Sequence, residues 1–217
     1  MDVHEAMENR RSCRAYLSQE VPREILTAVL QDAVCAPSAI NMQPWEFIVV
    51  SGEERLRLSR ALMKAYREQQ ISCGPGNIEP LPEVVQRRRT ISFERLFPLL
   101  NQMGMDFNQF VNEGSLNFYH APTAVILTLH RAFSHARFLD MGLAAAYFLL
   151  SAFHHGLATC PIGLICAYED TIKEVLNIRE SHHVVLGIAV GYEDPKSVIN
   201  EFRSPRDSLE TFTRWVD

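Results

Sequence analysis

The stretch "HARFLDMGLAAAYFLLSAFHHG", residues 135–156, decides the fold class of this chain. Its large apolar residues recur every three or four positions, as on one face of a helix: Leu139, Leu143, Ala146, Leu150 and Phe153. Other faces carry further apolar residues, and a helix that is apolar nearly all round is buried on both sides, in a large core or in a subunit interface. Because 217 residues provide a limited core, the sequence favours a homodimer interface, since symmetric dimers are the commonest oligomers.

Helices and strands alternate around this segment. Helical periodicity occurs in residues 2–9, 21–36, 53–70 and 169–178, and runs typical of strands occupy residues 45–52, 122–130, 160–168 and 182–194. This order of elements predicts an α+β fold in which a sheet lies between helices.

Residues 71–118 are less regular than the rest of the chain. They begin with the turn-rich "SCGPGNIEPLPEVV", contain an arginine run at 87–89, and hold helical pieces that Pro98 and Gly104 are expected to interrupt. Their apolar residues are too few for an independent core. The sequence therefore predicts a single domain over residues 1–217, with 71–118 as an insertion or flap.

Composition narrows the function classes. The formal net charge is -5 and the pI about 5.9, so binding to nucleic acid or to an anionic membrane surface is not expected. No stretch approaches the roughly 18 uncharged apolar residues of a membrane span, and residues 1–11 do not resemble a signal peptide. The five scattered cysteines lack C-x-x-C spacing, which predicts a reduced, cytoplasmic chain without a metal site and places Cys35 in the core.

Several chemical motifs are missing from the sequence. It contains no G-x-G-x-x-G after a strand and no G-x-x-x-x-G-K-[ST], so a glycine loop that holds nucleotide phosphates is not indicated. It also lacks G-x-S-x-G and H-E-x-x-H.

The stretch "NRRSCRAY", residues 9–16, is the first positive signal. Guanidinium forks and a hydroxyl match the oxygens of a phosphate, and this stretch supplies them from Arg10, Arg11, Ser12 and Arg14. The alternative is a solvated basic end of the short helix over residues 2–9, which complements the helix dipole.

Two further polar clusters lie far away along the chain. "APSAINMQPW", residues 36–45, presents Ser38, Asn41 and Gln43 between a buried helix and a buried strand, although a plain turn uses the same residue types. Arg203 and Arg206 flank Pro205 near the end of the sequence and could contribute to the same anion site. The alternative interpretation is that both are ordinary surface charges.

In combination these segments resemble the nitroreductase family of FMN-dependent oxidoreductases. "RRSCRAY", "VPREIL", "APSAINMQPWEFIVV", "FLDMGLAAAYFLLSAFHHGLATCPIG" and "VVLGIAVGYED" match in register from residue 8 to about 210, with 71–118 loose. The resemblance implies a central, mostly antiparallel or mixed sheet flanked by helices, in an intertwined homodimer with two FMN sites at the interface.

The resemblance also implies which residues bind the cofactor. Arg10, Arg11, Ser12 and Arg14, joined by Arg203 and Arg206, would hold the phosphate and ribityl chain. The flavin ring would be lined from the partner subunit by Pro37, Ser38, Ala39, Asn41 and Gln43, and from the same subunit by Pro161, Ile162 and Gly163. Some family members carry glutamate where this chain has Ile162, so only the backbone contact of that position is carried over.

The implied activity is hydride transfer from NADH or NADPH through flavin N5 to a small nitroaromatic or quinone acceptor, in a ping-pong sequence without a catalytic side chain. Two alternatives keep the flavin: another reaction on the same fold, such as reductive dehalogenation or flavin breakdown, and a non-catalytic redox sensor. A phosphate-binding module without flavin is a third alternative.

Overall fold

Strand β2 (Thr123–His130) is the centre of the structure, a computed structural model that describes residues 2–216. Within that range β2 lies between β1 (Trp45–Ser51) and β4 (His182–Gly191), and β3 (Ala158–Ile162) completes a four-stranded sheet of order β1-β2-β4-β3. All of these strand pairs are antiparallel. The predicted α+β fold with an antiparallel sheet is confirmed.

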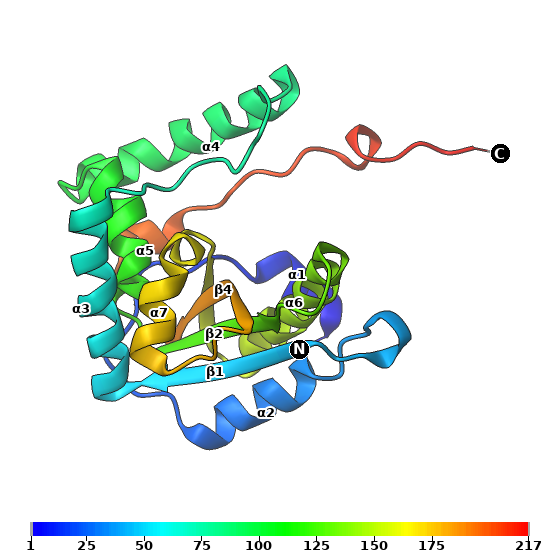
Figure 1. Ribbon diagram of the computed structural model, residues 1–217. Coiled ribbons are helices and arrows are strands. Elements are labelled where there is room, and N and C mark those ends of the chain that lie inside the picture. The colour runs from blue at the N-terminus through cyan, green and yellow to red at the C-terminus, as the bar shows by residue number, and fades with distance from the viewer. Residues whose placement is uncertain (1, 217) are drawn as a thin grey trace.

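Helices cover both faces of this sheet (Figure 1). Helices α2 and α6 pack on one face, and α3 and α7 pack on the other. The helix bounds are α1 (Val3–Asn9), α2 (Arg23–Ala33), α3 (Gly52–Gln69), α4 (Glu83–Gln102), α5 (Gly114–Leu116), α6 (Phe138–His154) and α7 (Glu169–Leu176).

Strand β2 connects two cores because its side chains alternate between the faces of the sheet. Val125, Leu127 and Leu129 are buried with residues of α2 and α6, whereas Ala124 and Ile126 are buried with residues of α3 and α7. Both faces exclude water, which explains why residues 123–129 of this strand are all buried and why its apolar residues form an unbroken run over 124–127.

Helix α6 belongs to the core on one side only. Met141, Ala145 and Phe148 pack against the sheet and α2, while Leu139 is 70% and Tyr147 42% exposed on the other side. Length and composition alone would allow the helical segment His135–His154 to cross a membrane, but its packing identifies it as a core helix with an additional exposed apolar face.

Helix α4 differs from the prediction that Pro98 interrupts residues 71–118, because the helix continues through it. Proline lacks the N–H that would bond to the Glu94 carbonyl, but both residues are exposed, so water can satisfy that oxygen. The prediction for Gly104 is right: this residue adopts a φ of +64°, and the Met105 N–H donates to the Leu100 carbonyl at 3.0 Å just after the helix ends.

Two smaller predictions are wrong. The segment after β3 forms a 3-10 helix, η5 (Leu164–Tyr168), instead of continuing as a strand, because the turn places Ile165 and Tyr168 in the core. Cys35 is exposed and not buried, since α2 ends at Ala33 and Cys35 lies beyond its apolar face.

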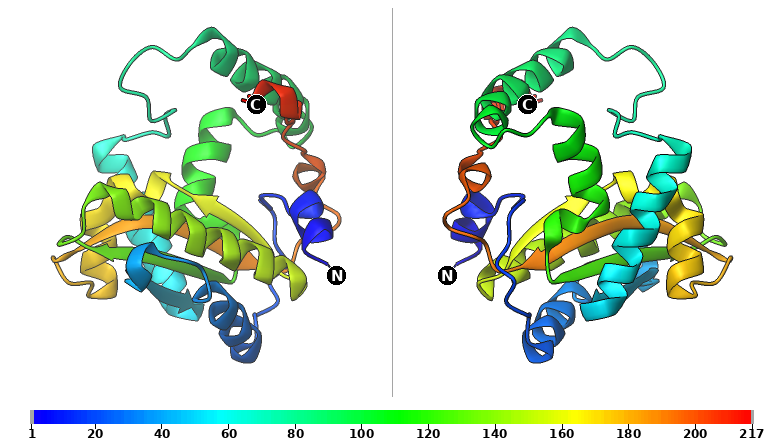
Figure 2. Two further views of the ribbon diagram at one scale, coloured as in Figure 1. Left: turned by 90° about the vertical axis from the view of Figure 1, so that its right-hand side faces the viewer. Right: turned by 90° about the vertical axis from the view of Figure 1, so that its left-hand side faces the viewer.

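The segment after β4 returns across the molecule to α4, as Figures 1 and 2 show. It passes through the 3-10 helix η6 (Val198–Glu201) and continues as residues 202–216, which we call the C-terminal tail. Arg88 Nε donates to Asp207 Oδ2 at 2.7 Å, and the Arg88 guanidinium lies 4.7 Å from the centre of the Phe212 ring. The tail is therefore attached to α4.

Candidate functional site

The predicted N-terminal and C-terminal arginines line one cavity of about 280 Å³. Among its polar lining residues are Arg10, Arg11, Ser12, Arg14, Arg203 and Arg206. We call this cavity the arginine pocket. Glu8 is the only acidic residue that lines it within residues 2–216, so the pocket is strongly cationic in a chain of net charge -5.

Local structure explains how the first arginines reach this pocket. Helix α1 ends at Asn9, and the chain then runs extended beside β3, where Ser12 pairs with Thr159. The Cys13 N–H donates to the Thr159 carbonyl at 2.9 Å. Residues 10–14 therefore extend the edge of the sheet, with Arg10 and Arg14 on the side of the pocket.

Asn200 attaches the second arginine segment to the first. Its buried side chain accepts the Arg14 N–H at 3.0 Å and donates to the Ala15 carbonyl at 2.8 Å. Its own carbonyl accepts from Arg203 Nη1 at 2.8 Å. The sequence analysis missed Asn200, and only its position in η6 just before the tail arginines could have indicated it.

Two arginines of the pocket repel each other. The pKa of Arg10 is lowered, first by partial burial and then by the positive charge of Arg206. Among residues 2–216 neither side chain forms an ion pair, and Arg206 donates only to oxygens of Ser204 and Pro205. A bound anion would remove this repulsion.

Arg11 differs from its neighbours because its guanidinium is already occupied. It forms an ion pair with Glu193, and Arg11 Nε donates to the Asn200 carbonyl at 3.2 Å. Both partners of the ion pair are about one quarter exposed, at 25% and 28%. Arg11 therefore connects the end of β4 to η6 and supports the pocket from behind.

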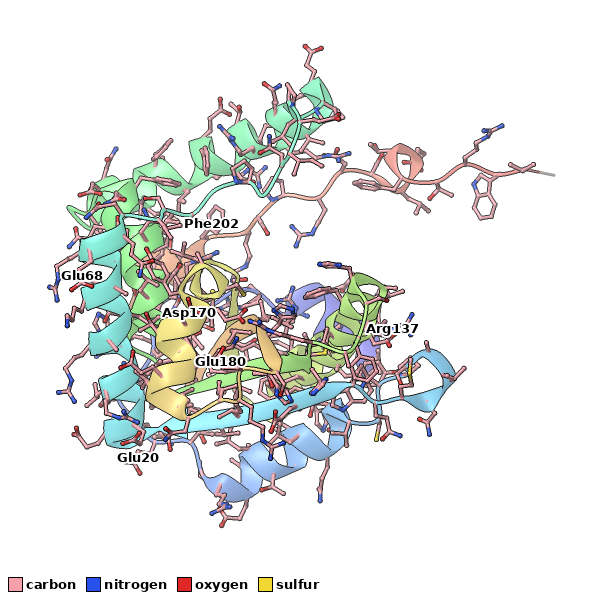
Figure 3. The ribbon with its side chains drawn as sticks, viewed as in Figure 1. Glu20, Glu68, Arg137, Asp170, Glu180 and Phe202 are labelled. Atoms are coloured by element: carbon pink, nitrogen blue, oxygen red, sulfur yellow. The ribbon has the colours of Figure 1, made fainter. Side chains whose placement is uncertain are left out.

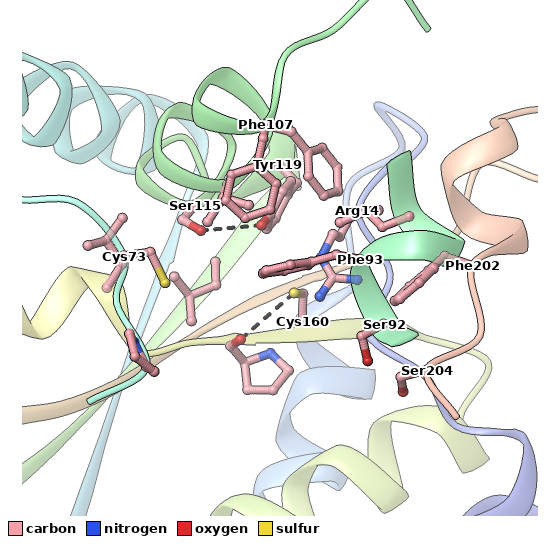
Figure 4. A pocket seen from close by; sticks show the side chains of 18 of the residues that line it. Arg14, Cys73, Ser92, Phe93, Phe107, Ser115, Tyr119, Cys160, Phe202 and Ser204 are labelled. Atoms are coloured by element: carbon pink, nitrogen blue, oxygen red, sulfur yellow. Dashed lines mark hydrogen bonds between the residues drawn. The ribbon is translucent and has the colours of Figure 1, made fainter. Parts of the chain in front are cut away.

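A second cavity of about 580 Å³ adjoins the arginine pocket, since Arg14, Phe202 and Ser204 line both. Its floor is the end of β3, where Figure 4 labels Cys160, and the residues that follow, Pro161, Ile162 and Gly163. We call it the aromatic cavity after its rings, which belong to Phe93, Phe107, Phe110, Tyr119 and Phe202.

Arg14 connects the two cavities. Its guanidinium carbon lies 5.9 Å from the ring centres of Phe110, Tyr119 and Phe202, an arrangement in which the ring faces stabilise the positive charge (Figure 4). The backbone around Tyr119 is unusual, because all three residues of η3 (Phe118–His120) have positive φ, between 49° and 59°. Such strained segments often occur at functional sites.

The Tyr119 ring is held by a close approach to the backbone. A Cβ at Gly114 would lie 2.7 Å from Tyr119 Cε1, so only glycine leaves room for the ring. The Tyr119 hydroxyl lies 3.2 Å from Ser115 Oγ (Figure 4). Sequence reasoning singled out neither Gly114 nor Tyr119.

The cysteine in the floor is a neutral thiol. Burial raises the pKa of Cys160, although the charge of Arg14 and a hydrogen bond with Ser12 act in the opposite direction. At neutral pH this side chain is protonated and contributes a weakly polar surface to the cavity.

The loop of residues 37–43 does not line either cavity within the described chain, and it projects from the side of the molecule between α2 and β1 (Figure 1). Ser38 Oγ accepts the Gln43 N–H at 2.9 Å, and Gln43 Nε2 donates to Asn41 Oδ1 at 3.0 Å. Ile40 at the tip has a φ of 44° and is 90% exposed. Five predicted site residues are therefore apart from the others: Pro37, Ser38, Ala39, Asn41 and Gln43.

Fold and site together define an α+β protein in which a cationic pocket opens into an aromatic cavity. The family model for the nitroreductase family matches residues 7–192, and this chain belongs to that family.

Relatives resemble the chain over nearly its whole length. It is 37% identical over 213 residues to nitroreductase NfnB of Mycolicibacterium smegmatis, covering 96% of this chain and 90% of the relative. It is 29% identical over 221 residues to a 4-nitrobenzoate reductase of Pseudomonas putida, covering 99% of this chain and 96% of the relative. The crystal structure of FMN-dependent nitroreductase NfnB from Mycobacterium smegmatis in complex with NADPH superimposes with a TM-score of 0.88 at 34% identity, covering 100% of both chains.

Proposed function

We propose that this chain is an FMN-dependent enzyme that passes electrons from NADH or NADPH to small nitroaromatic or quinone acceptors. One observation carries the proposal: the arginine pocket, with its mutually repelling Arg10 and Arg206, opens directly into the aromatic cavity. That combination fits a flat aromatic cofactor with a phosphate at one end. The printed names of relatives, including 4-nitrobenzoate reductase and chloronitrobenzene nitroreductase, support the acceptor class.

The phosphate end is assigned to the arginine pocket. A phosphate monoester carries a charge of roughly −1.5 to −2, which would offset the repulsion between the two unpaired arginines. Arg10, Arg206 and Arg203 would donate to its oxygens, with Ser12 and Arg14 towards the ribityl chain. Arg11 is assigned a supporting role, because Glu193 and Asn200 already occupy its guanidinium.

The ring end is assigned to the aromatic cavity. Backbone N–H groups of Ile162 and Gly163 at the end of β3 would donate to the pyrimidine side of the ring and stabilise negative charge there. When bound, FMN would supply the chemistry itself by accepting a hydride from NADH or NADPH and then reducing the acceptor in a ping-pong sequence. The protein orients the ring, limits the access of water and admits one reactant at a time.

Residues 71–118 are assigned as the flap over this cavity, within a single domain. Ser92 and Phe93 of α4 line the cavity together with Phe107 (Figure 4). Phe110 of the same segment lines it as well. The flap therefore shapes the acceptor site.

A homodimer would bring the separate loop to the site. Leu139 and Tyr147 of α6, with Val3 and Met7 of α1, form an exposed apolar surface that a second copy of the chain would cover. Ile40 is an exposed apolar residue with a strained backbone, which is consistent with a loop that packs against a second subunit. In such a dimer, residues 37–43 would line the cofactor ring of the partner. All five cysteines are free thiols, which supports the assignment to the cytoplasm.

Spectroscopy and turnover test this function. The purified protein should carry a flavin absorption band and oxidise NADH or NADPH when 4-nitrobenzoate or menadione is added, with parallel double-reciprocal plots. A bound flavin without turnover would contradict the enzyme and support the redox sensor. A colourless protein that FMN does not stabilise against heat would contradict the cofactor.

Two variants test the assignment of the pocket. Arg206→Ala and Arg14→Ala should each release FMN more readily during gel filtration, whereas Arg23→Ala, at an exposed position of α2, should retain it. Equal retention in all three variants would refute the phosphate assignment.

A further inference from the structure

Helix α4 presents a single stripe of side chains to the aromatic cavity. Arg89, Ser92, Phe93 and Leu96 line it, and their spacing of three and four residues places them on one helix face. The stripe offers a cation, a hydroxyl, an aromatic ring and an aliphatic group in that order. This order matches a molecule with a flat apolar body and a polar end.

The cavity contains cations but no carboxylates. Its charged lining residues within residues 2–216 are Arg14 and Arg89, and no Asp or Glu side chain lines it. Glu68, Asp170 and Glu180 are examples of acidic residues that are exposed on the outer surface instead (Figure 3). In a chain of net charge -5, this local positive field attracts anions into the cavity.

The two cations are in different situations. Arg14 lies among three aromatic rings, and its Nη1 donates to the Ser12 carbonyl at 3.3 Å. Arg89 lies 5.6 Å from the centre of the Phe93 ring, and within the described chain its guanidinium makes no ion pair or hydrogen bond. Its planar donors are therefore available to a ligand.

Its neighbours on α4 do not share this position. Arg88 is paired with Asp207, and Arg87, which is exposed as Arg89 is, lines no described cavity. Arg89 also lines a smaller outer cavity of about 230 Å³ near Pro75 and Leu81, so it stands at the mouth of the aromatic cavity. A molecule passing between the two cavities contacts Arg89 and Pro75, which line both.

We propose that Arg89 is a specificity-determining residue that binds an anionic group on a reactant. The group that we assign to it is the carboxylate of an aromatic acceptor. The inference rests on the proposed function and names the acceptor class within it. An acceptor of the benzoate type would place its carboxylate at Arg89, with Ser92 as a second donor, and its ring beside Phe93. Arginine is suited to this because its guanidinium can bind a carboxylate through two parallel hydrogen bonds.

The second source of an anionic group is the electron donor. In a ping-pong sequence NADPH enters the same cavity before the acceptor, and it differs from NADH by one phosphate. The experiment separates the two sources with two pairs of reactants, each of which differs in the anionic group: 4-nitrobenzoate and its methyl ester for the acceptor, and NADPH and NADH for the donor.

The test compares Arg89→Gln with Arg87→Gln as the matched control. For acceptors, 4-nitrobenzoate is compared with its neutral methyl ester, and benzoate serves as a ligand that is not reduced. Arg89→Gln should raise KM for 4-nitrobenzoate and Kd for benzoate about three- to fivefold, as expected for a charge pair with an exposed arginine, and change values for the ester less than about 1.5-fold. Arg87→Gln should change none of them.

Each outcome decides the inference. A raised KM for NADPH relative to NADH, with benzoate binding unchanged, supports an anion site at Arg89 and assigns it to the donor phosphate. Unchanged benzoate binding, 4-nitrobenzoate kinetics and NADPH kinetics in Arg89→Gln would overturn it. Benzoate binding is measured at equilibrium by calorimetry, so the anion site is tested even if the wild-type protein has no turnover and the proposed function fails.

Discussion

Arg10 and Arg11 are adjacent in the sequence, but the structure predicts opposite consequences when each is replaced by glutamine. Arg11 pairs with Glu193 and donates to the Asn200 carbonyl, so its loss removes two stabilising interactions from the folded state. Arg10 is partly buried and repelled by Arg206, so its loss removes an unfavourable interaction unless an anion is bound.

The expected magnitudes follow from this geometry. The Arg11 ion pair is about one quarter exposed, and with the hydrogen bond it should contribute roughly 1–2 kcal/mol to the free energy of unfolding. For a chain of 217 residues that corresponds to a lower Tm by about 3–6 °C. Arg10→Gln should leave the Tm of the FMN-free protein within about 1 °C and weaken FMN binding roughly tenfold to hundredfold, because one charge-assisted hydrogen bond is lost.

Thermal unfolding of FMN-free protein and fluorescence titration with FMN measure both quantities on the same samples. Arg23→Gln on α2 serves as the control, and a double-mutant cycle with Glu193→Gln should give a coupling free energy of about 1 kcal/mol for the ion pair. The reasoning is refuted if Arg11→Gln keeps its Tm and loses FMN as strongly as Arg10→Gln.

Three further perturbations test the fold around the site. Gly187→Ala should cost about 1–3 kcal/mol, because the new Cβ would overlap Ile165 Cδ1, and chemical unfolding should show partial recovery in a double variant with Ile165→Val. Burial raises the pKa of the Cys13 thiol from its usual value of 9.0 to about 11 in the folded protein. The contribution of this thiol to stability is therefore complete below pH 9.0 and is lost as the pH rises from 9.0 to 11. Urea unfolding at each pH should show this fall in the free energy of unfolding, and a smaller fall in Cys13→Ala. Asp207→Asn should change Tm by less than about 2 °C but increase hydrogen exchange in residues 83–102, because it removes the ion pair with Arg88, in which both side chains are about one third exposed. Unchanged exchange would mean that the tail does not hold α4.

Periodicity predicted the sheet and the core helices because these segments are buried by their own chain. Strand β2 has an unbroken apolar run over residues 124–127 since both of its faces are covered. On α6 the predicted stripe is not the buried face: Leu139 and Ala146 are exposed. The face that packs against the sheet and α2 carries Met141, Ala145 and Phe148 instead. The same reasoning misjudged α4, where exposure of Pro98 lets the helix continue. The local sequence pattern indicates which secondary structure a residue favours. How much free energy an unfavourable residue such as Pro98 costs in a helix depends on its exposure, which the pattern does not give.

The candidate site was predictable as a set of residues but not as a set of contacts. Arg10, Arg203 and Arg206 do lie around one pocket, and Pro161–Gly163 form the floor of the adjoining cavity. The engagement of Arg11 by Glu193 depends on where β4 ends, which the sequence does not state. The cofactor roles of these residues, including the loop at 37–43, stay predictions that the variants above test.

The arginine pocket has a consequence for the order of events during folding. Its two halves are joined by hydrogen bonds between residues far apart in the sequence, such as Arg11 and Asn200, which are 189 positions apart, and β4 precedes the second half along the chain. The strands of the sheet and the buried residues of both cores all precede Arg203 along the chain, so the sheet and both cores can form before the second half of the pocket is in place. A ligand that needs both halves can bind only after the tail has joined this sheet, so the sheet and both cores have to form without the ligand's assistance.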